Sequence, residues 1–145
     1  MTDSKIKIGI SLRVIDAERY SEKRDALSHD WTLFFEEINV FPVLIPNTIS
    51  NVREFLEKMQ LDGFLLSGGD NIGDNPERDK TEQEIIRFGL DNNLPIFGVC
   101  RGMQAINKYF HGETEILANS KHVGKSHAVK IINSNFSSLL KTSSI

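Results

Sequence analysis

The sequence has little of what marks several common protein classes. Its single cysteine cannot form an internal disulfide bond, so a reducing, cytoplasmic location fits best. It has no apolar run long enough to span a bilayer, and the apolar stretch near its start is too short for a secretion signal. Basic residues are not in excess, because the formal net charge is −3, and no basic stripe predicts nucleic-acid binding. We therefore expect one domain, with neither a membrane nor a nucleic acid as partner.

Strand-like and helix-like segments alternate along most of the chain. Short apolar stretches predict strands at residues 6–11, 41–45, 63–66 and 95–99. Apolar residues at helical spacing predict helices at residues 27–38, 52–59, 79–90 and 103–110. We expect the charge-rich residues 13–24 to form a loop. Four repeats of strand and helix favour a mostly parallel central sheet between two helical layers, a three-layer α-β-α arrangement.

Two further expectations concern where elements begin and how the chain continues. Asp79 and Glu82 have the spacing of a capping box, with Asp in place of Ser or Thr, which predicts that the third helix begins there. After Gly112 the alternation stops. Residues 113–118 and 127–133 resemble two short strands of an antiparallel hairpin, and the tail has only a weakly amphipathic start.

A candidate nucleophile, Cys100, lies directly between the fourth predicted strand and the next helix. Gly98 and Gly102 flank it in a G-x-C-x-G pattern, the thiol counterpart of the G-x-S-x-G turn of hydrolases. Such a turn needs glycines because the backbone at the nucleophile is strained and the helix packs tightly beneath it. The helix N-terminus would favour a thiolate, and the backbone N–H of Arg101 would face a developing oxyanion. The alternative is an inert buried cysteine, which would not need two flanking glycines.

A second glycine-rich turn, Ser67-Gly68-Gly69-Asp70, follows the third predicted strand. In an open parallel sheet, ligands bind in the crevice outside the carboxyl ends of the strands, so this turn would lie beside the cysteine. The backbone N–H of Gly69 would then supply a second oxyanion donor. An ordinary Gly-Gly turn is the alternative, and it would be favoured if the turn stood alone.

These motifs resemble the class I glutamine amidotransferase domain, and more closely its free-standing hydrolase branch, peptidase C26. The residues that carry the resemblance are Ser67-Gly68-Gly69-Asp70 and Gly98-Val99-Cys100-Arg101-Gly102-Met103-Gln104. Within that branch, which includes γ-glutamyl-γ-aminobutyrate hydrolase, the sequence is most similar to γ-glutamyl-CDP-amidate hydrolases of surface-polysaccharide pathways. The segments that carry this likeness are Ile10-Ser11-Leu12-Arg13, Arg24-Asp25-Ala26-Leu27, Trp31 and Pro42-Val43-Leu44-Ile45-Pro46-Asn47. The resemblance implies a flavodoxin-like α/β fold.

The resemblance also implies a chemistry. Cys100 would attack the γ-carbonyl of glutamine or of another γ-glutamyl amide, forming a thioester that water then hydrolyses, with no cofactor or metal. Gly69 and Arg101 would donate their backbone N–H groups to the oxyanion. Gln104 would contact the glutamyl group, and Gly68 would line the same site. On its own, Gln104 would be an ordinary polar helix residue.

The resemblance suggests further substrate contacts near the N-terminus. Arg13, Arg24 and Asp25 lie on or beside the predicted loop and would contact the amine portion of the substrate. A solvated, charged loop explains these three residues equally well.

The sequence departs from the family at one point. Class I domains complete a catalytic triad with His and Glu in a His-Pro-Glu or similar motif, and no such motif occurs before Ile145. His29, His111, His122 and His127 lie elsewhere, and their spacing does not predict a zinc site. We expect a C-terminally truncated hydrolase domain with impaired activity. The alternatives are an inactive remnant that only binds ligands, and a glutaminase subunit that supplies ammonia to a synthetase. We also expect self-association through the exposed sheet edge.

Overall fold

The computed structural model describes residues 6–115, 126 and 128–141. The chain divides into two compact units, residues 1–114 and residues 115–145, and each is described by itself. The first unit contains the sheet and helices α1 to α4. The second contains helix α5.

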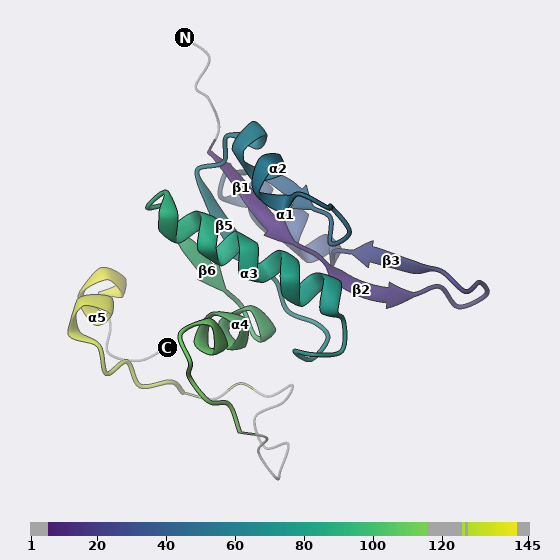
Figure 1. Cartoon of the computed structure of the whole chain (residues 1–145). Coiled ribbons are helices and arrows are strands. Elements are labelled where there is room, and N and C mark those ends of the chain that lie inside the picture. Colours follow the sequence, from purple (N-terminus) through teal and green to yellow (C-terminus); the bar gives the residue numbers. More distant parts are fainter. Residues whose placement is uncertain (1–5, 116–125, 127, 142–145) are drawn as a thin grey trace. The chain divides into compact units, whose positions relative to one another are not determined.

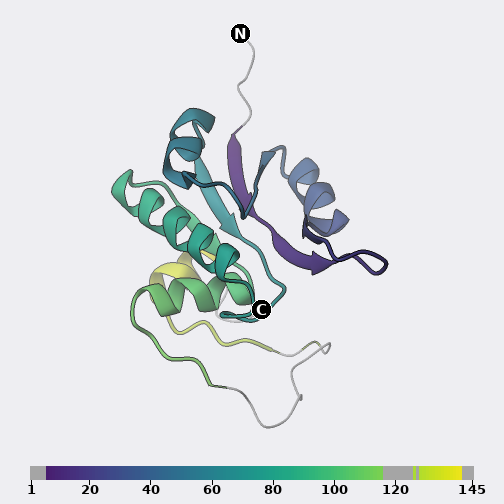
Figure 2. The same cartoon turned by 45° about the vertical axis from the view of Figure 1, so that its right-hand side comes forward.

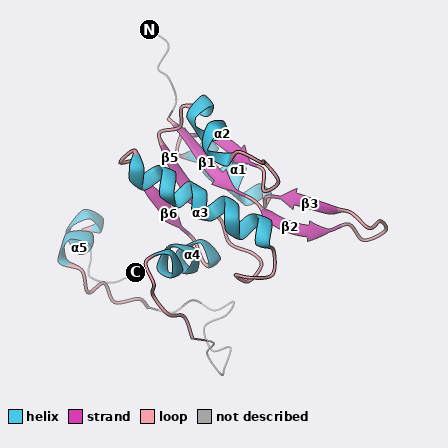
Figure 3. Ribbon diagram, viewed as in Figure 1, coloured by secondary structure: helices cyan, strands magenta, loops and turns pink. Residues whose placement is uncertain are grey.

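The centre of the first unit is a parallel sheet with the strand order β4-β1-β5-β6 (Figure 1). Strand β1 (Lys7–Ser11) pairs with β4 (Phe41–Ile45) on one side and with β5 (Gly63–Leu66) on the other. Strand β6 (Ile96–Gly98) pairs with β5. The four strands run in the same direction (Figure 3), so the loop after β5 and the turn after β6 are neighbours at the carboxyl edge. The predicted parallel sheet is confirmed.

Helices cover both faces of this sheet (Figure 2). Helices α2 (Val52–Met59), α3 (Pro76–Asp91) and α4 (Arg101–Tyr109) contribute to one core cluster, and α1 (His29–Glu37) contributes to the other. The predicted three-layer arrangement is therefore present. The second helix begins and ends where the apolar spacing places it.

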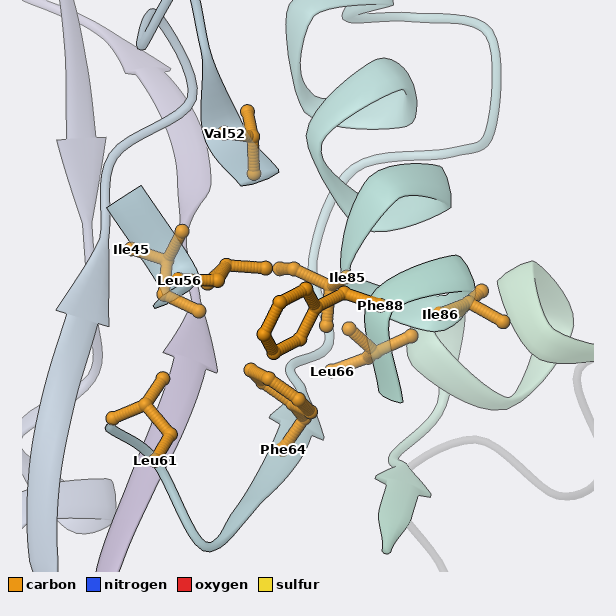
Figure 4. Packing of buried hydrophobic residues seen from close by; sticks show 9 residues of the cluster. All are labelled: Ile45, Val52, Leu56, Leu61, Phe64, Leu66, Ile85, Ile86 and Phe88. Atoms are coloured by element: carbon orange, nitrogen blue, oxygen red, sulfur yellow. The ribbon is translucent and has the colours of Figure 1, made fainter. Parts of the chain in front are cut away.

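Alternation along β5 divides its side chains between the two cores. Phe64 and Leu66 belong to the larger cluster, shown in Figure 4, whereas Leu65 packs with Ile10 in the smaller one. Phe64 meets Phe88 of α3 edge-on, with 6.0 Å between the ring centroids. Burying a large apolar side chain contributes roughly 1.5–3 kcal/mol relative to leaving it exposed. Strand β5, which carries the glycine-rich turn, is thus held on both faces.

The loop predicted at residues 13–24 is wrong, because most of this region is an antiparallel hairpin of β2 (Arg13–Asp16) and β3 (Lys23–Ala26). Most side chains of both strands are exposed, so no apolar alternation marks the strands in the sequence. The hairpin is anchored at its base. The Asp25 carboxylate accepts a hydrogen bond of 2.9 Å from the backbone N–H of Asn47.

The predicted start of the third helix is also wrong. Helix α3 begins at Pro76, with Asn75 as its N-cap residue. Proline suits the first helical position because its missing N–H would have no partner there. Asp79 and Glu82 therefore lie inside the helix and do not form a capping box.

Strands β4 and β6 are the two outer strands of the sheet within the described residues, and Phe97 of β6 is 61% exposed. Self-association through this edge stays a prediction.

The predicted second hairpin falls largely outside the described residues. Residues 113–115 are not in a strand, and residues 128–133 contain only an isolated bridge at Lys130. Helix α5 (Ser134–Leu140) follows. Within the described part of the chain, no helix has the length and apolar character needed to cross a membrane.

Candidate active site

The turn between β6 and α4 holds Cys100 in a strained backbone conformation. Cys100 is the N-cap residue of α4, with φ 52° and ψ −108°, and it is exposed. A positive φ in a residue that has a Cβ typically costs on the order of 1–3 kcal/mol, so it persists only where the surrounding packing enforces it. The sharp turn expected from the G-x-C-x-G pattern is present.

Two close backbone approaches enforce this turn. A methyl group on Gly98 would lie 2.5 Å from the carbonyl carbon of Gly102. A methyl group on Gly102 would lie 2.1 Å from the carbonyl oxygen of Leu66 in β5. Because backbone atoms cannot move aside as a flexible side chain can, both positions require glycine. The glycines let α4 begin directly against β5 and β6.

The glycine-rich turn after β5 lies beside the cysteine. The backbone N–H of Val99 donates to the carbonyl of Leu66 at 2.9 Å, which keeps the two strand ends in register. A methyl group on Gly68 would lie 3.5 Å from the Cβ of Cys100. Gly69 has φ 116°, a conformation that favours glycine.

Two backbone donors near the thiol are unused. Among the described residues, neither the N–H of Gly69 nor that of Arg101 has a hydrogen-bond partner. Arg101 is the first residue of α4, and the N–H groups of a first helical turn have no partner within the helix. An oxyanion hole requires free N–H donors of this kind, and the role of these two groups as oxyanion donors stays a prediction.

A crevice of about 200 Å³ adjoins the two turns. Its lining includes Arg13, Leu27, Trp31, Ser67, Gly68 and Val99. Arg13 is exposed, and its guanidinium has no hydrogen-bond or ion-pair partner in the described part of the chain. Its stem packs on Gly69, because a methyl group there would lie 2.9 Å from the Cβ of Arg13. The crevice thus offers an unpaired guanidinium and a half-buried indole beside the cysteine turn.

A buried cluster of charged side chains, which the sequence did not lead us to expect, lies behind the two turns. Glu82 of α3 is 2% exposed. Its Oε1 accepts hydrogen bonds from the Ser11 hydroxyl at 2.8 Å and from Nε of Arg78 at 3.0 Å. Its Oε2 accepts one from Nη1 of Arg101, whose Nη2 pairs with Asp79. The side chain of Arg101 therefore binds Glu82 and Asp79 in the interior. The oxyanion donor that we predict on Arg101 is its backbone N–H, which these contacts do not use.

Arg78 connects this cluster to the glycine-rich turn. It is 0% exposed, and its Nη2 donates to the carbonyl oxygens of Ser67 at 2.8 Å and Gly68 at 3.0 Å. Its Nη1 donates to the carboxylate of Asp70 at 3.2 Å. A single guanidinium therefore binds three of the four residues of the turn.

The carboxyl of Asp70 has a pKa below its ordinary value of 3.8. Burial raises this pKa, but hydrogen bonds from the backbone N–H groups of Val14 and Asp70 and from the Arg78 guanidinium lower it further than burial raises it. The charged form is thus favoured in the folded chain. Asp70 joins the hairpin to the buried cluster, since Val14 belongs to β2.

The other predicted site residues lie in three different settings. Gln104 is half-buried in α4, and its backbone N–H donates to the carbonyl of Cys100 at 3.2 Å. Arg24 is on the exposed hairpin and pairs with Glu22. Both carboxylate oxygens of Asp25 bind Asn47, so this side chain anchors the hairpin. Substrate contact by Gln104, Arg24 and Asp25 stays a prediction.

The two histidines that the structure describes, His29 and His111, do not lie on the cysteine turn. His29 is the first residue of α1, and His111 follows the far end of α4, with φ 62°. His122 and His127 lie outside the described residues. A larger cavity of about 330 Å³ between α3 and α4 is lined by His111, Asp79 and Lys108, among others, but not by Cys100. The described part of the chain contains no group of His, Cys, Asp and Glu suited to a metal ion.

The sequence carries a signal that would have revealed the buried cluster. Arg78 and Glu82 lie four residues apart, and Ile85 and Gly89 continue the same helical face toward the core. Charged residues in line with a buried apolar stripe indicate buried ion pairs. The capping-box interpretation hid this pattern because it placed Glu82 in the first turn.

The parallel sheet, the strained cysteine turn and the adjacent glycine turn define an α/β protein whose exposed cysteine lies on a sharp strand-to-helix turn. The model of the Peptidase C26 family matches residues 7–142, and the chain belongs to this family.

Curated relatives agree with this assignment. The γ-glutamyl-CDP-amidate hydrolase of Campylobacter jejuni is 32% identical over 125 residues, covering 81% of this chain and 61% of that protein. A glutamine amidotransferase-like protein of Rickettsia prowazekii is 28% identical over 102 residues, covering 60% of this chain and 36% of that protein. A glutamine-hydrolysing GMP synthase of Bacillus cytotoxicus is 36% identical over 89 residues, covering 61% of this chain and 16% of that protein. The chain spans less than two thirds of the length of each.

Proposed function

We propose that this chain carries the nucleophile side of a site that hydrolyses γ-glutamyl amides. The observation that carries the proposal is the backbone of Cys100, held at φ 52° between two glycines that backbone contacts make obligatory. A strained, exposed cysteine at the start of a helix suits a nucleophile better than a packing residue. Its relatives, named above, are glutamine- or γ-glutamyl-directed proteins, which supports the substrate class.

The chemistry follows from the two turns. The Cys100 thiolate adds to the γ-carbonyl carbon, and the carbonyl oxygen becomes an oxyanion that accepts hydrogen bonds from the N–H groups of Gly69 and Arg101. The C–N bond then breaks, and the amine leaves after taking up a proton. Water adds to the γ-glutamyl thioester, the C–S bond breaks, and glutamate and the thiol are released.

The crevice beside the cysteine turn suits the amine portion of the substrate. Arg13 would pair with an anionic group there, and Trp31 would provide an apolar wall. An amine that carries phosphate fits this combination, in agreement with the γ-glutamyl-CDP-amidate hydrolase among the relatives. A surface-polysaccharide pathway and a cytoplasmic location remain part of this proposal.

Among the described residues we assign no general acid or base for proton transfer to the leaving amine. The His–Glu pair that the family resemblance implies has no matching motif in the sequence. General acid–base catalysis typically contributes ~10²–10⁴-fold, so we propose that turnover by this chain is reduced by about that factor. Attack by the thiol on a reactive electrophile does not need a His–Glu pair.

A covalent label tests the proposal without requiring turnover. The diazoketone analogue of glutamine, with a diazomethyl group in place of the amide –NH₂, takes up a proton at the diazo carbon. The thiolate then forms a C–S bond at that carbon, and N₂ leaves. We expect mass spectrometry to find one adduct on Cys100, formed faster than by an analogue that lacks the α-amino and α-carboxyl groups. Equal rates for both analogues would contradict recognition of the glutamyl group.

A second candidate function is a glutaminase subunit, which the glutamine-hydrolysing GMP synthase among the relatives favours. Glutamine and a γ-glutamyl amide with a phosphorylated amine separate the two candidates. Faster glutamate release from glutamine would favour the glutaminase. No release from either substrate, together with no selective labelling, would leave a binding module.

A further inference from the structure

We propose that Glu82 is a positioning residue that fixes the glycine-rich turn after β5 and the cysteine turn after β6 relative to each other. This inference rests on the proposed function, since the two turns are the two sides of the proposed oxyanion hole. Glu82 lies on α3 and belongs to neither turn. Its carboxylate is the point where the side chains of Ser11 from β1, Arg78 from α3 and Arg101 from α4 meet.

The carboxylate of Glu82 is fully engaged. Three donors converge on its two oxygens, from the Ser11 hydroxyl, Nε of Arg78 and Nη1 of Arg101. The side chains of Glu82, Arg78 and Arg101 are each 2% exposed or less. Only a carboxylate can accept from all three donors, because an amide of the same shape has a single acceptor oxygen.

One branch of the cluster leads to the glycine-rich turn. Arg78, oriented by Glu82, donates to the carbonyls of Ser67 and Gly68. Ser11 provides a second connection, because its hydroxyl accepts from the backbone N–H of Ser67 at 3.0 Å while it donates to Glu82. Movement of the Glu82 carboxylate would therefore shift the turn that carries Gly69.

The other branch leads to the nucleophile. Arg101 follows Cys100 directly, and its guanidinium reaches back into the core to Glu82. The same residue supplies a proposed oxyanion donor through its backbone N–H. Movement at Glu82 would thus shift that N–H and the cysteine beside it.

Stability alone does not explain a buried cluster of this kind. Replacing buried ion pairs by well-packed apolar residues is often neutral or stabilising, so a core at this position would not need charges. Directed hydrogen bonds supply what apolar packing does not, namely a fixed distance between two backbone segments. An error of about 1 Å in such a distance can cost on the order of 10²-fold in rate.

The test compares two electrophiles on three versions of the chain: wild type, Glu82→Gln and Glu84→Gln. Glu84 is the matched control, since it lies on the same helix but pairs with the exposed Arg87. The diazoketone analogue of glutamine reports the alignment of the thiol with the oxyanion donors, whereas iodoacetamide reports the thiol alone. The readout is the ratio of the two labelling rates at Cys100.

We expect Glu82→Gln to lower this ratio at least ten-fold and Glu84→Gln to leave it within two-fold of wild type, following the cost of misplacement given above. Hydrogen exchange should become faster in both turns together in Glu82→Gln, and in neither turn in Glu84→Gln. A purely structural role would lower the melting temperature without changing the ratio in the folded fraction. An unchanged ratio with unchanged exchange in the two turns would overturn the proposal.

Two further results separate this inference from the proposed function. If the wild-type chain shows no preference for the diazoketone, the proposed function fails, and the exchange of the two turns still decides the role of Glu82. If Glu82→Gln does not fold, Glu82→Asp keeps the charge but shortens the reach. It should give a folded chain with an intermediate ratio or intermediate exchange, and wild-type values of both would overturn the proposal.

Discussion

Gly102 of α4 lies directly against the carbonyl group of Leu66 in β5, so that a methyl group on the glycine would be 2.1 Å from the carbonyl oxygen. This contact fixes where α4 begins and therefore where Cys100 is held. The same contact holds the cysteine turn against β5, a strand that is buried on both faces.

The first prediction concerns this contact. Gly102→Ala should destabilise the first unit by roughly 1–3 kcal/mol or more, because added atoms in a close-packed region force backbone shifts. Gly68→Ala is the comparison, since its methyl group would meet the Cβ of Cys100 at an ordinary 3.5 Å. Urea unfolding measures both. A Gly102→Ala chain as stable as Gly68→Ala would show that α4 can move away from β5 at little cost.

Asp70 gives a prediction about pH. Its pKa in the folded chain is below 3.8, so its charge stabilises the fold above that pH and stops doing so as the pH falls through the lowered value. Asp70→Asn should therefore be less stable than wild type at neutral pH, and the difference should shrink below pH 3.8. Unfolding curves across acidic pH measure this, with the exposed Asp16→Asn as control for net charge. A gap that stayed constant down to the lowest pH would argue against the linkage.

Arg13 tests the amine side of the proposed site. Arg13→Gln should weaken the protection of Cys100 from iodoacetamide by a γ-glutamyl amide with a phosphorylated amine, by about ten-fold, because a charge-assisted hydrogen bond contributes roughly 1.5–3 kcal/mol. The same change at Arg24, which already pairs with Glu22, should have a smaller effect. Equal protection in wild type and Arg13→Gln would remove Arg13 from the site. A larger effect at Arg24 would reassign the contact to the hairpin.

The core under the site gives a stability prediction. Ile85 of α3 is 0% exposed and belongs to the cluster shown in Figure 4. Ile85→Ala should cost about 2–5 kcal/mol, the usual range for such truncations in a core. Leu90→Ala, on the same helix but 45% exposed, is the control and should cost less. Thermal unfolding of both variants measures the difference. Similar losses would mean that the packing around Ile85 relaxes to fill the cavity.

The sheet could be predicted from the sequence because β5 is a short apolar run followed by two glycines, and because β1 carries isoleucines at alternating positions. The sharp turn at Cys100 could be predicted because two flanking glycines at a strand end have few other uses. The hairpin at residues 13–26 could not, since most of its side chains are exposed and leave no periodic pattern.

The proposed positioning role of Glu82 could not be predicted from the residues around it in the sequence either. Its importance depends on Ser11 and Arg101, which come from distant parts of the chain and meet it only in the folded unit. Spacing within one helix can indicate that a charge is buried, but it does not reveal which segments provide the partners.

The contacts of Glu82 with distant segments determine the order in which the first unit can fold during synthesis. Ser11, the turn after β5 and Arg78 leave the ribosome before Arg101, so Glu82 lacks one of its partners until α4 has emerged. A buried carboxylate without its partner is costly, so water should stay around Glu82 until then. Only afterwards can β6 and α4 close on β5 and force the backbone of Cys100 into its strained form. The nascent chain would therefore keep its thiol in a relaxed segment until the rest of the first unit is in place.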